Sequence, residues 1–291
     1  MKTQKELTAL EPRKLAEIEH SRRRRSILQG FERRSDTHKD QEVPNLDLLI
    51  LDKEAFNYHF SNIKFYSVAQ SSEAYQYFWL ARKCRHGVKV LDFACGNGEN
   101  AIFAAKCGAE TIGIDISPDG VANANLNALQ AGVSDHCSFE VMDGEKMSFA
   151  DNTFDIGVEY GALHHVDLER AMAELNRVIK PQGEMICVEA LRHNPFIHWY
   201  RKGTPHLRTK WEVEHILSLE DLRVVREYFS DIEVRFFHLA VLAAVPFRKT
   251  RIFNPLRKFL DRIDNFLLKK EFIGKYSWIM IFSMSNAAKS S

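Results

Sequence analysis

Short runs of β-branched and other apolar residues alternate with stretches of helical periodicity through the middle of the chain. The apolar runs, which predict strands, are 88–93, 110–115, 137–142, 152–159 and 184–191. Helix-compatible stretches separate most of these runs. Strands that alternate with helices are typical of a parallel sheet covered by helices on both faces. The pattern therefore predicts an α/β fold with a doubly wound, mostly parallel sheet.

Both ends of the chain extend this pattern. Residues 1–87 begin polar and charged and then become rich in aromatic side chains, so we expect a separate N-terminal segment with helical character. The remaining residues, 88–291, are expected to form the main domain with two insertions and two further strands. The insertions are expected at about 192–217 and 243–274, and the strands at 232–242 and 276–285.

Two glycines directly follow the first predicted strand. Gly96 and Gly98 come after Asp92, and a helix-compatible stretch begins at Glu99. Glycines permit a sharp bend, and the free amides at a helix N-terminus can bind an anionic or oxygen-rich part of a ligand. At the end of the strand, Asp92 would repel a pyrophosphate but attract the ammonium group of an amino-acid-like cofactor tail. The turn therefore favours S-adenosylmethionine over a nicotinamide dinucleotide, whose loose glycine fingerprint it also satisfies.

Further acids end the neighbouring predicted strands. Asp115 lies nineteen residues after Gly96, where a carboxylate can accept hydrogen bonds from both ribose hydroxyls. Asp143 follows the third strand, and an acid there points into the crevice at the carboxyl ends of the strands. Its alternative role is that of a loop acid with turn chemistry. Glu159 ends the fourth strand.

With these motifs in this order, Val88–Leu191 resembles the class I S-adenosylmethionine-dependent methyltransferases, and within them the small-molecule group that includes the menaquinone/ubiquinone-type C-methyltransferases. The resemblance implies a seven-stranded Rossmann-like sheet whose last two strands pair antiparallel, and a helical lid formed by residues 1–87. It also implies that Asp143 meets the adenine amino group and that Tyr66 lies near the cofactor. The expected cofactor contacts are Tyr66, Asp92, Ala94, Gly96, Asn97, Gly98, Asp115, Ile116, Asp143, Gly144, Glu145 and Glu159.

One residue departs from the family pattern. Ala94 replaces the first glycine of the usual Gly-x-Gly-x-Gly sequence, which adds one methyl group near the methionyl tail. Because alanine is the smallest addition, we expect cofactor binding to be retained. A protein that binds the cofactor without catalysing a reaction remains an alternative.

The segment from Glu159 to His165 contains the candidate catalytic residues. In the resembled family this loop borders both the transferred methyl group and the substrate. It lacks the [Asn/Asp]-Pro-Pro-aromatic sequence with which such enzymes methylate the exocyclic amines of nucleic-acid bases. A small-molecule acceptor is therefore expected. Tyr160, His164 and His165 are candidates for accepting a proton, although both histidines could instead be structural. No metal is expected, since no other ligand is spaced to complete a zinc site.

These features predict a methyltransferase that acts by in-line transfer and releases S-adenosylhomocysteine. Holding donor and acceptor in line can supply much of the catalysis. The acceptor and the atom that is methylated (C, O or N) stay open, among lipid-like, isoprenoid and natural-product compounds. Basic and aromatic residues in 192–217 suit an anionic or aromatic acceptor. A nicotinamide-dependent oxidoreductase is the other enzymatic alternative.

Composition narrows the remaining choices. The net charge of +1 argues against a protein that coats nucleic acid, and the five cysteines contain no CxxC pair, which favours reduced thiols. No apolar run reaches the ~18 residues of a membrane span, and the N-terminus has no signal-like apolar region. We therefore expect a cytoplasmic protein. Peripheral membrane contact is one option for the basic amphipathic stretch 254–269. Nothing in the sequence predicts the oligomeric state.

Overall fold

The computed structural model describes residues 10–26, 28–29, 49–50 and 53–287. Parts of the predicted N-terminal lid therefore lie outside the described residues. Two short strands, β1 (Leu28–Gln29) and β2 (Leu49–Ile50), pair antiparallel and are separate from the main sheet.

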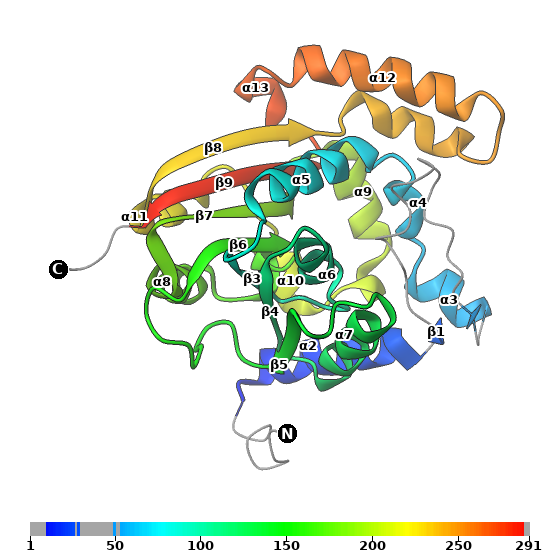
Figure 1. Ribbon diagram of the computed structural model, residues 1–291. Coiled ribbons are helices and arrows are strands. Elements are labelled where there is room, and N and C mark those ends of the chain that lie inside the picture. The colour runs from blue at the N-terminus through cyan, green and yellow to red at the C-terminus, as the bar shows by residue number, and fades with distance from the viewer. Residues whose placement is uncertain (1–9, 27, 30–48, 51–52, 288–291) are drawn as a thin grey trace.

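The main sheet has seven strands in the order β5-β4-β3-β6-β7-β9-β8 (Figure 1). Their bounds are β3 Lys89–Phe93, β4 Glu110–Asp115, β5 Cys137–Val141, β6 Phe154–Tyr160, β7 Ile179–Ala190, β8 Phe229–Phe237 and β9 Ile279–Ala287. Strands β3 to β7 run parallel, whereas β9 is antiparallel to both of its neighbours. This confirms the predicted doubly wound sheet. The strand order reverses between β3 and β6, which is where such sheets bind ligands.

Helices cover both faces of the sheet because side chains alternate along each strand. Leu91 and Phe93 of β3 pack in one core cluster with α8 and α11, whereas Val90 packs in another with α5 and part of α6. The helices are α5 Gln70–Lys83, α6 Glu99–Lys106, α7 Pro118–Gln130, α8 Leu168–Val178 and α11 Leu222–Tyr228. The N-terminal helix α2 (Pro12–Ser26) lies beside α7 (Figure 1).

The two predicted insertions are helical. The first contains α9 (Pro195–Gly203), the 3₁₀ helix η3 (Pro205–Leu207) and α10 (Lys210–His215). The second contains α12 (Phe253–Leu267) and α13 (Glu271–Gly274). Phe259 and Phe266 of α12 are exposed, so membrane contact by this basic helix stays a prediction. Among the described residues, no helix is both long and apolar enough to cross a bilayer.

The predicted strand boundaries differ most from the structure at the end of β8 and the start of β7. Strand β8 ends at Phe237, not at residue 242, because His238 adopts a left-handed conformation with φ of 68°. The next residues form the 3₁₀ helix η4 (Ala240–Phe247). Asp264 of α12 fixes this turn by accepting hydrogen bonds from three successive backbone amides, those of residues 239, 240 and 241. At the other boundary, β7 begins at Ile179 rather than at residue 184, with irregular pairing to β6.

The two glycines after β3 give a matched test of this turn. Both have positive φ, 55° for Gly96 and 83° for Gly98. A Cβ on Gly98 would lie 2.5 Å from the Phe139 ring, whereas a Cβ on Gly96 would have no neighbour within 4 Å. We expect Gly98→Ala to lower the free energy of unfolding by about 2–4 kcal/mol, and Gly96→Ala by about 1 kcal/mol. Equal losses in denaturant unfolding would contradict this packing.

Candidate active site

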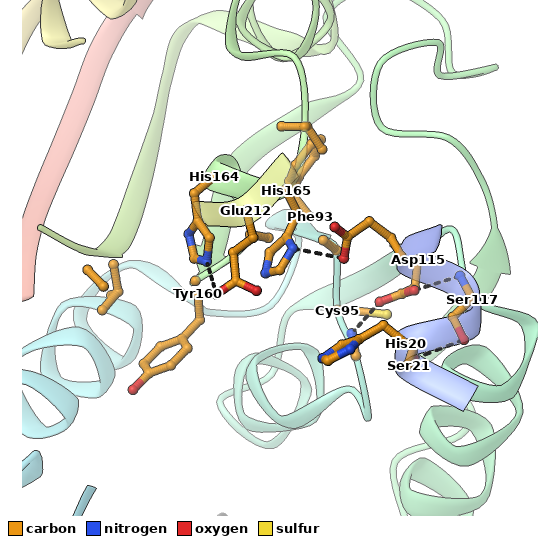
Figure 2. A pocket seen from close by; sticks show the side chains of 18 of the residues that line it. His20, Ser21, Phe93, Cys95, Asp115, Ser117, Tyr160, His164, His165 and Glu212 are labelled. Carbon is orange, nitrogen blue, oxygen red and sulfur yellow. Dashed lines mark hydrogen bonds and ion pairs between the residues drawn. The ribbon is translucent and has the colours of Figure 1, made fainter. Parts of the chain in front are cut away.

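A cavity of about 530 Å³ opens at the carboxyl ends of β3, β4 and β6, next to the reversal in strand order. Its walls come from the loops that follow these strands and β5, from helix α2, from residues 62–77, from the segment from α9 to α10, and from the start of β9. Figure 2 shows side chains from α2, from α10 and from the ends of β3, β4 and β6 around this space. Residues far apart in the sequence therefore build one site.

The turn after β3 presents backbone to the cavity. Of the predicted cofactor contacts in this turn, Ala94, Gly96 and Asn97 line the cavity, whereas Gly98 does not and packs beneath the turn against Phe139. Ala94 has φ of 53°, a conformation in which glycine is usual, and this explains why the family pattern has a glycine there.

Asp92 lies behind this turn and not on the cavity wall. It is 1% exposed, and its Oδ2 accepts a hydrogen bond of 3.0 Å from the amide of Ala101 in α6. Burial raises its pKa to about 8, and its Oδ1 has no partner in the part of the chain that the structure describes. The predicted direct contact with an ammonium group is therefore corrected: Asp92 supports the start of α6. Asn100, which accepts a hydrogen bond from Gln76, lines the cavity instead, and no local sequence pattern indicates either residue.

Asp115 reaches the cavity from the end of β4, as predicted. Its Oδ2 accepts from the Gly96 amide at 2.9 Å and its Oδ1 from the Ser117 amide at 2.7 Å. Each oxygen keeps a second lone pair, so the oriented carboxylate can accept two further hydrogen bonds. Ile116 lines the cavity beside it.

Helix α2 forms ion pairs with the acids that follow β5. Lys14 donates to Asp143 at 2.6 Å, and Arg13 donates twice to Glu145, at 2.7 and 2.5 Å. Burial would raise the pKa of Glu145, but hydrogen bonds from Arg13, the Asp167 amide and Lys14 lower it to about 2. Asp143, Gly144 and Glu145, the predicted cofactor contacts after β5, all line the cavity. Their ion pairs with α2 were missed, because no local pattern links residues so far apart in sequence.

Two fully buried glutamates lie side by side beneath the loop after β6. Burial and the charge of Glu189 raise the pKa of Glu159 well above its usual range. Burial opposes ionisation of Glu189 as well, but His164 holds its pKa below the usual value. Glu159 is therefore protonated and Glu189 ionised. Glu159 accepts the Ala162 amide and does not line the cavity, so its predicted cofactor contact is corrected to support of this loop.

Glu189 orients His164 in the 3₁₀ helix η2 (Leu163–His165). His164 Nδ1 lies 2.6 Å from Glu189 Oε2, and the Leu163 amide donates to the other oxygen of Glu189 at 2.6 Å. An ionised carboxylate only accepts, so His164 Nδ1 is the donor in this contact. Nε2 faces Glu212 of α10, 4.0 Å away (Figure 2). Glu189 therefore fixes Nε2 as the ring atom that is left for a ligand in the cavity.

His165 is held by a different carboxylate from the one that holds His164. Its Nδ1 lies 2.9 Å from Glu17 of α2. Burial alone would lower its pKa, but the Glu17 hydrogen bond and the charges of Glu212 and Glu189 raise it to about 9. His165 is therefore an imidazolium at neutral pH and a poor base. Tyr160, the third predicted candidate, lines the cavity (Figure 2).

A third side chain, which no local sequence pattern indicates, lies beside the histidines. His164, His165 and Glu212 have ligand atoms within 4.8 Å of one another, a spacing that suits a metal ion. However, Arg208 Nε lies 3.3 Å from Glu212, and His165 is already cationic. These charges are balanced without a cation, so we assign no metal to this group.

Aromatic rings form the wall opposite the glycine turn. Tyr66, predicted near the cofactor, lines the cavity, and its ring centroid lies 5.4 Å from that of Trp278. Phe65 and Tyr200 pack edge to face at 4.8 Å and also line it. The segment 192–217 lies on the ligand side, as its place after β7 predicted.

Known proteins resemble the chain over part of its length. The family described as "Methyltransferase domain" matches residues 91–187. The sterol 4-C-methyltransferase of Caenorhabditis elegans is 31% identical over 151 residues, which cover 47% of this chain and 45% of that protein. The demethylmenaquinone methyltransferase of Symbiobacterium thermophilum is 32% identical over 179 residues, which cover 60% of this chain and 68% of that protein. The chain thus spans less than half of the first relative.

A solved structure supports the fold. The geranyl diphosphate C-methyltransferase from Streptomyces coelicolor has a TM-score of 0.53 and 16% identity, with 81% of this chain and 86% of that chain covered. At this identity the likeness concerns the fold alone.

Removing the carboxylate beside His165 tests its charge state. A pKa raised to about 9 means that protonated His165 stabilises the fold fully below its ordinary pKa of about 6.5, and that this stabilisation is lost as pH rises through 9. In Glu17→Gln we expect the pKa of His165 to fall by roughly 1–2 pH units. Titration of the imidazole resonances by NMR measures it, with exposed His136 as an internal reference. An unchanged midpoint would contradict the assigned ion pair.

Proposed function

The chain belongs to the class I S-adenosylmethionine-dependent methyltransferases that act on small molecules, and we propose that one end of its cavity binds the cofactor and the other end binds the acceptor. The turn after β3 and the loops after β4 and β5 hold the cofactor. Helices α9 and α10 border the acceptor, a lipid-like, isoprenoid or natural-product compound. When bound, S-adenosylmethionine supplies a methyl group activated by its positively charged sulfur.

The orientation of Asp115 carries the proposed cofactor placement. The amides of Gly96 and Ser117 fix its carboxylate at the edge of the glycine turn, with one lone pair free on each oxygen. That arrangement fits the two hydroxyls of a ribose. The backbone of Gly96 is open to the cavity, and a ligand can lie against it. Asp143 is suited to the adenine amino group, although it must then share its carboxylate with Lys14.

His164 is the residue that we assign to proton removal. For an acceptor whose attacking atom carries a proton, that proton moves to Nε2 of His164. The charge of Glu189 at Nδ1 then stabilises the resulting imidazolium. His165 is already protonated and cannot do this. Tyr160 borders the same space, where it helps to exclude water.

Equilibrium binding separates a methyltransferase from a nicotinamide oxidoreductase. We expect S-adenosylhomocysteine to bind in calorimetry and NADH not to bind. Asp115→Ala should weaken S-adenosylhomocysteine about 10- to 100-fold, because two hydrogen bonds to a charged acceptor are lost. Asp135→Ala removes an exposed acid and is the matched control. Tight NADH binding together with no binding of S-adenosylhomocysteine at millimolar concentration would overturn the proposal.

Substitution of His164 tests the proposed base. Formation of S-adenosylhomocysteine, measured with a panel of quinone, sterol and isoprenoid acceptors, identifies a substrate. With an acceptor that must lose a proton, His164→Gln should lower kcat about 100-fold or more and abolish the acid limb of the pH profile. Affinity for S-adenosylhomocysteine should not change. His136→Gln, at an exposed site, is the control. An unaltered kcat would show that His164 has a structural role and does not remove the proton.

A further inference from the structure

Three arginines meet at the acceptor end of the cavity. Arg24 comes from α2, Arg201 from α9, and Arg208 from the turn before α10. Glu212 of α10 lines the same space and is the acid beside Arg208, with 3.3 Å between its Oε1 and Arg208 Nε. The side chains of Arg208 and Glu212 are only 9% and 13% exposed. The group therefore lies in a largely water-excluded pocket.

Few of the guanidinium donors are used within the protein. Arg201 donates to the Leu191 carbonyl at 2.9 Å, and Arg208 donates to the Thr204 carbonyl at 3.2 Å in addition to its contact with Glu212. Arg24 lies 4.5 Å over the ring of Phe60, and its guanidinium makes no hydrogen bond within the described part of the chain. Each guanidinium has five N–H donors in a fixed fork that matches an oxyanion.

Only one of these arginines has a close acidic partner. Arg208 is paired with Glu212, whereas no ion pair of Arg24 or Arg201 is found among the described residues, although the charge of Glu189 also acts on Arg201. Burial and the charge of Arg208 lower the pKa of Arg201 to about 10, which leaves it charged at neutral pH. Nearby His20 contributes no charge, since burial and Arg24 lower its pKa, and His165 is paired with Glu17. Buried charges without partners are costly, so a ligand with negative charge is favoured here.

The cofactor's own carboxylate is the competing partner for these arginines. The methionyl tail of S-adenosylmethionine carries an ammonium as well as a carboxylate group, and its sulfonium adds a further positive charge. The bound cofactor therefore adds no net negative charge, and an anionic acceptor is the complementary ligand for Arg24 and Arg201.

We propose that Arg24, Arg201 and Arg208 bind an oxyanion of the methyl acceptor, in the form of a phosphate, diphosphate or carboxylate group. The aromatic wall beside them suits an apolar or aromatic body on the same molecule. This assignment rests on the proposed methyltransferase function. It narrows the acceptor to an amphiphile whose charged end lies on α2, α9 and α10.

Calorimetry on the full chain saturated with S-adenosylhomocysteine tests this site. Inorganic phosphate, pyrophosphate and benzoate are the probes, and benzamide is the neutral match for benzoate. We expect at least one oxyanion to bind and benzamide not to bind. Whichever probe binds with the higher affinity, phosphate-type or benzoate, identifies the chemistry of the acceptor's charged end.

Matched variants locate the binding. Arg24→Gln and Arg201→Gln should each weaken the bound oxyanion about 10-fold or more, and Arg201→Lys should restore part of the affinity. Arg22→Gln and Lys202→Gln, exposed neighbours on the same helices, should have no effect. Because Arg201 is buried, thermal unfolding of each variant is measured to show that the variant is folded. Arg24→Gln tests the same oxyanion site through a substitution on a different helix.

Three outcomes would count against the proposals. Saturable binding of S-adenosylhomocysteine without any oxyanion binding at millimolar concentration would overturn this site and leave the proposed function intact. Weakened binding of S-adenosylhomocysteine in Arg24→Gln and Arg201→Gln, with oxyanion binding unchanged, would assign the arginines to the cofactor's own carboxylate and overturn the site. Failure of S-adenosylhomocysteine to bind the unsubstituted protein would instead overturn the proposed function.

Discussion

The cavity exists because ion pairs hold helix α2 across the carboxyl ends of the strands. Arg13 and Lys14 bind the acids after β5, and Glu17 binds His165 after β6. Arg25 donates to Asn97 in the glycine turn at 2.6 Å. These contacts remove water from one side of the site, and charges in a site with less water interact more strongly. Without α2, the turn after β3 and the loop after β6 would face solvent.

Burial then gives chemically similar side chains different protonation states. Glu159 and Glu189 are both fully buried, yet only Glu189 has a histidine beside it, and it is the one that ionises. His164 and His165 are adjacent in sequence, but the acceptors at their Nδ1 atoms come from β7 and α2. A single turn thus presents two histidines whose Nδ1 atoms are held by carboxylates from different elements. The difference comes from the partners and not from the residue types.

The matched family segment and the rest of the chain contribute to different parts of the site. Residues 91–187 contain the glycine turn, Asp115 and Asp143, which we assign to the cofactor. Arg24, Arg201 and Arg208 all lie outside that segment. The relatives include a sterol and a demethylmenaquinone methyltransferase, so proteins of this family act on different acceptors. We therefore expect the segments that surround the shared core to determine which acceptor is bound.

The sequence alone determined the strands, the glycine turn and the place of Asp115, because apolar periodicity and turn residues act over a few neighbouring positions. It did not reveal that Asp92 and Glu159 face away from the cavity or that β8 stops at Phe237. Those outcomes depend on hydrogen bonds to amides and on Asp264, a residue of a distant helix. Tertiary structure also decided which acids α2 would pair with and which arginines would gather in the cavity. Charge compensation depends on which side chains meet in space. The positions of those side chains along the sequence do not show which of them will meet.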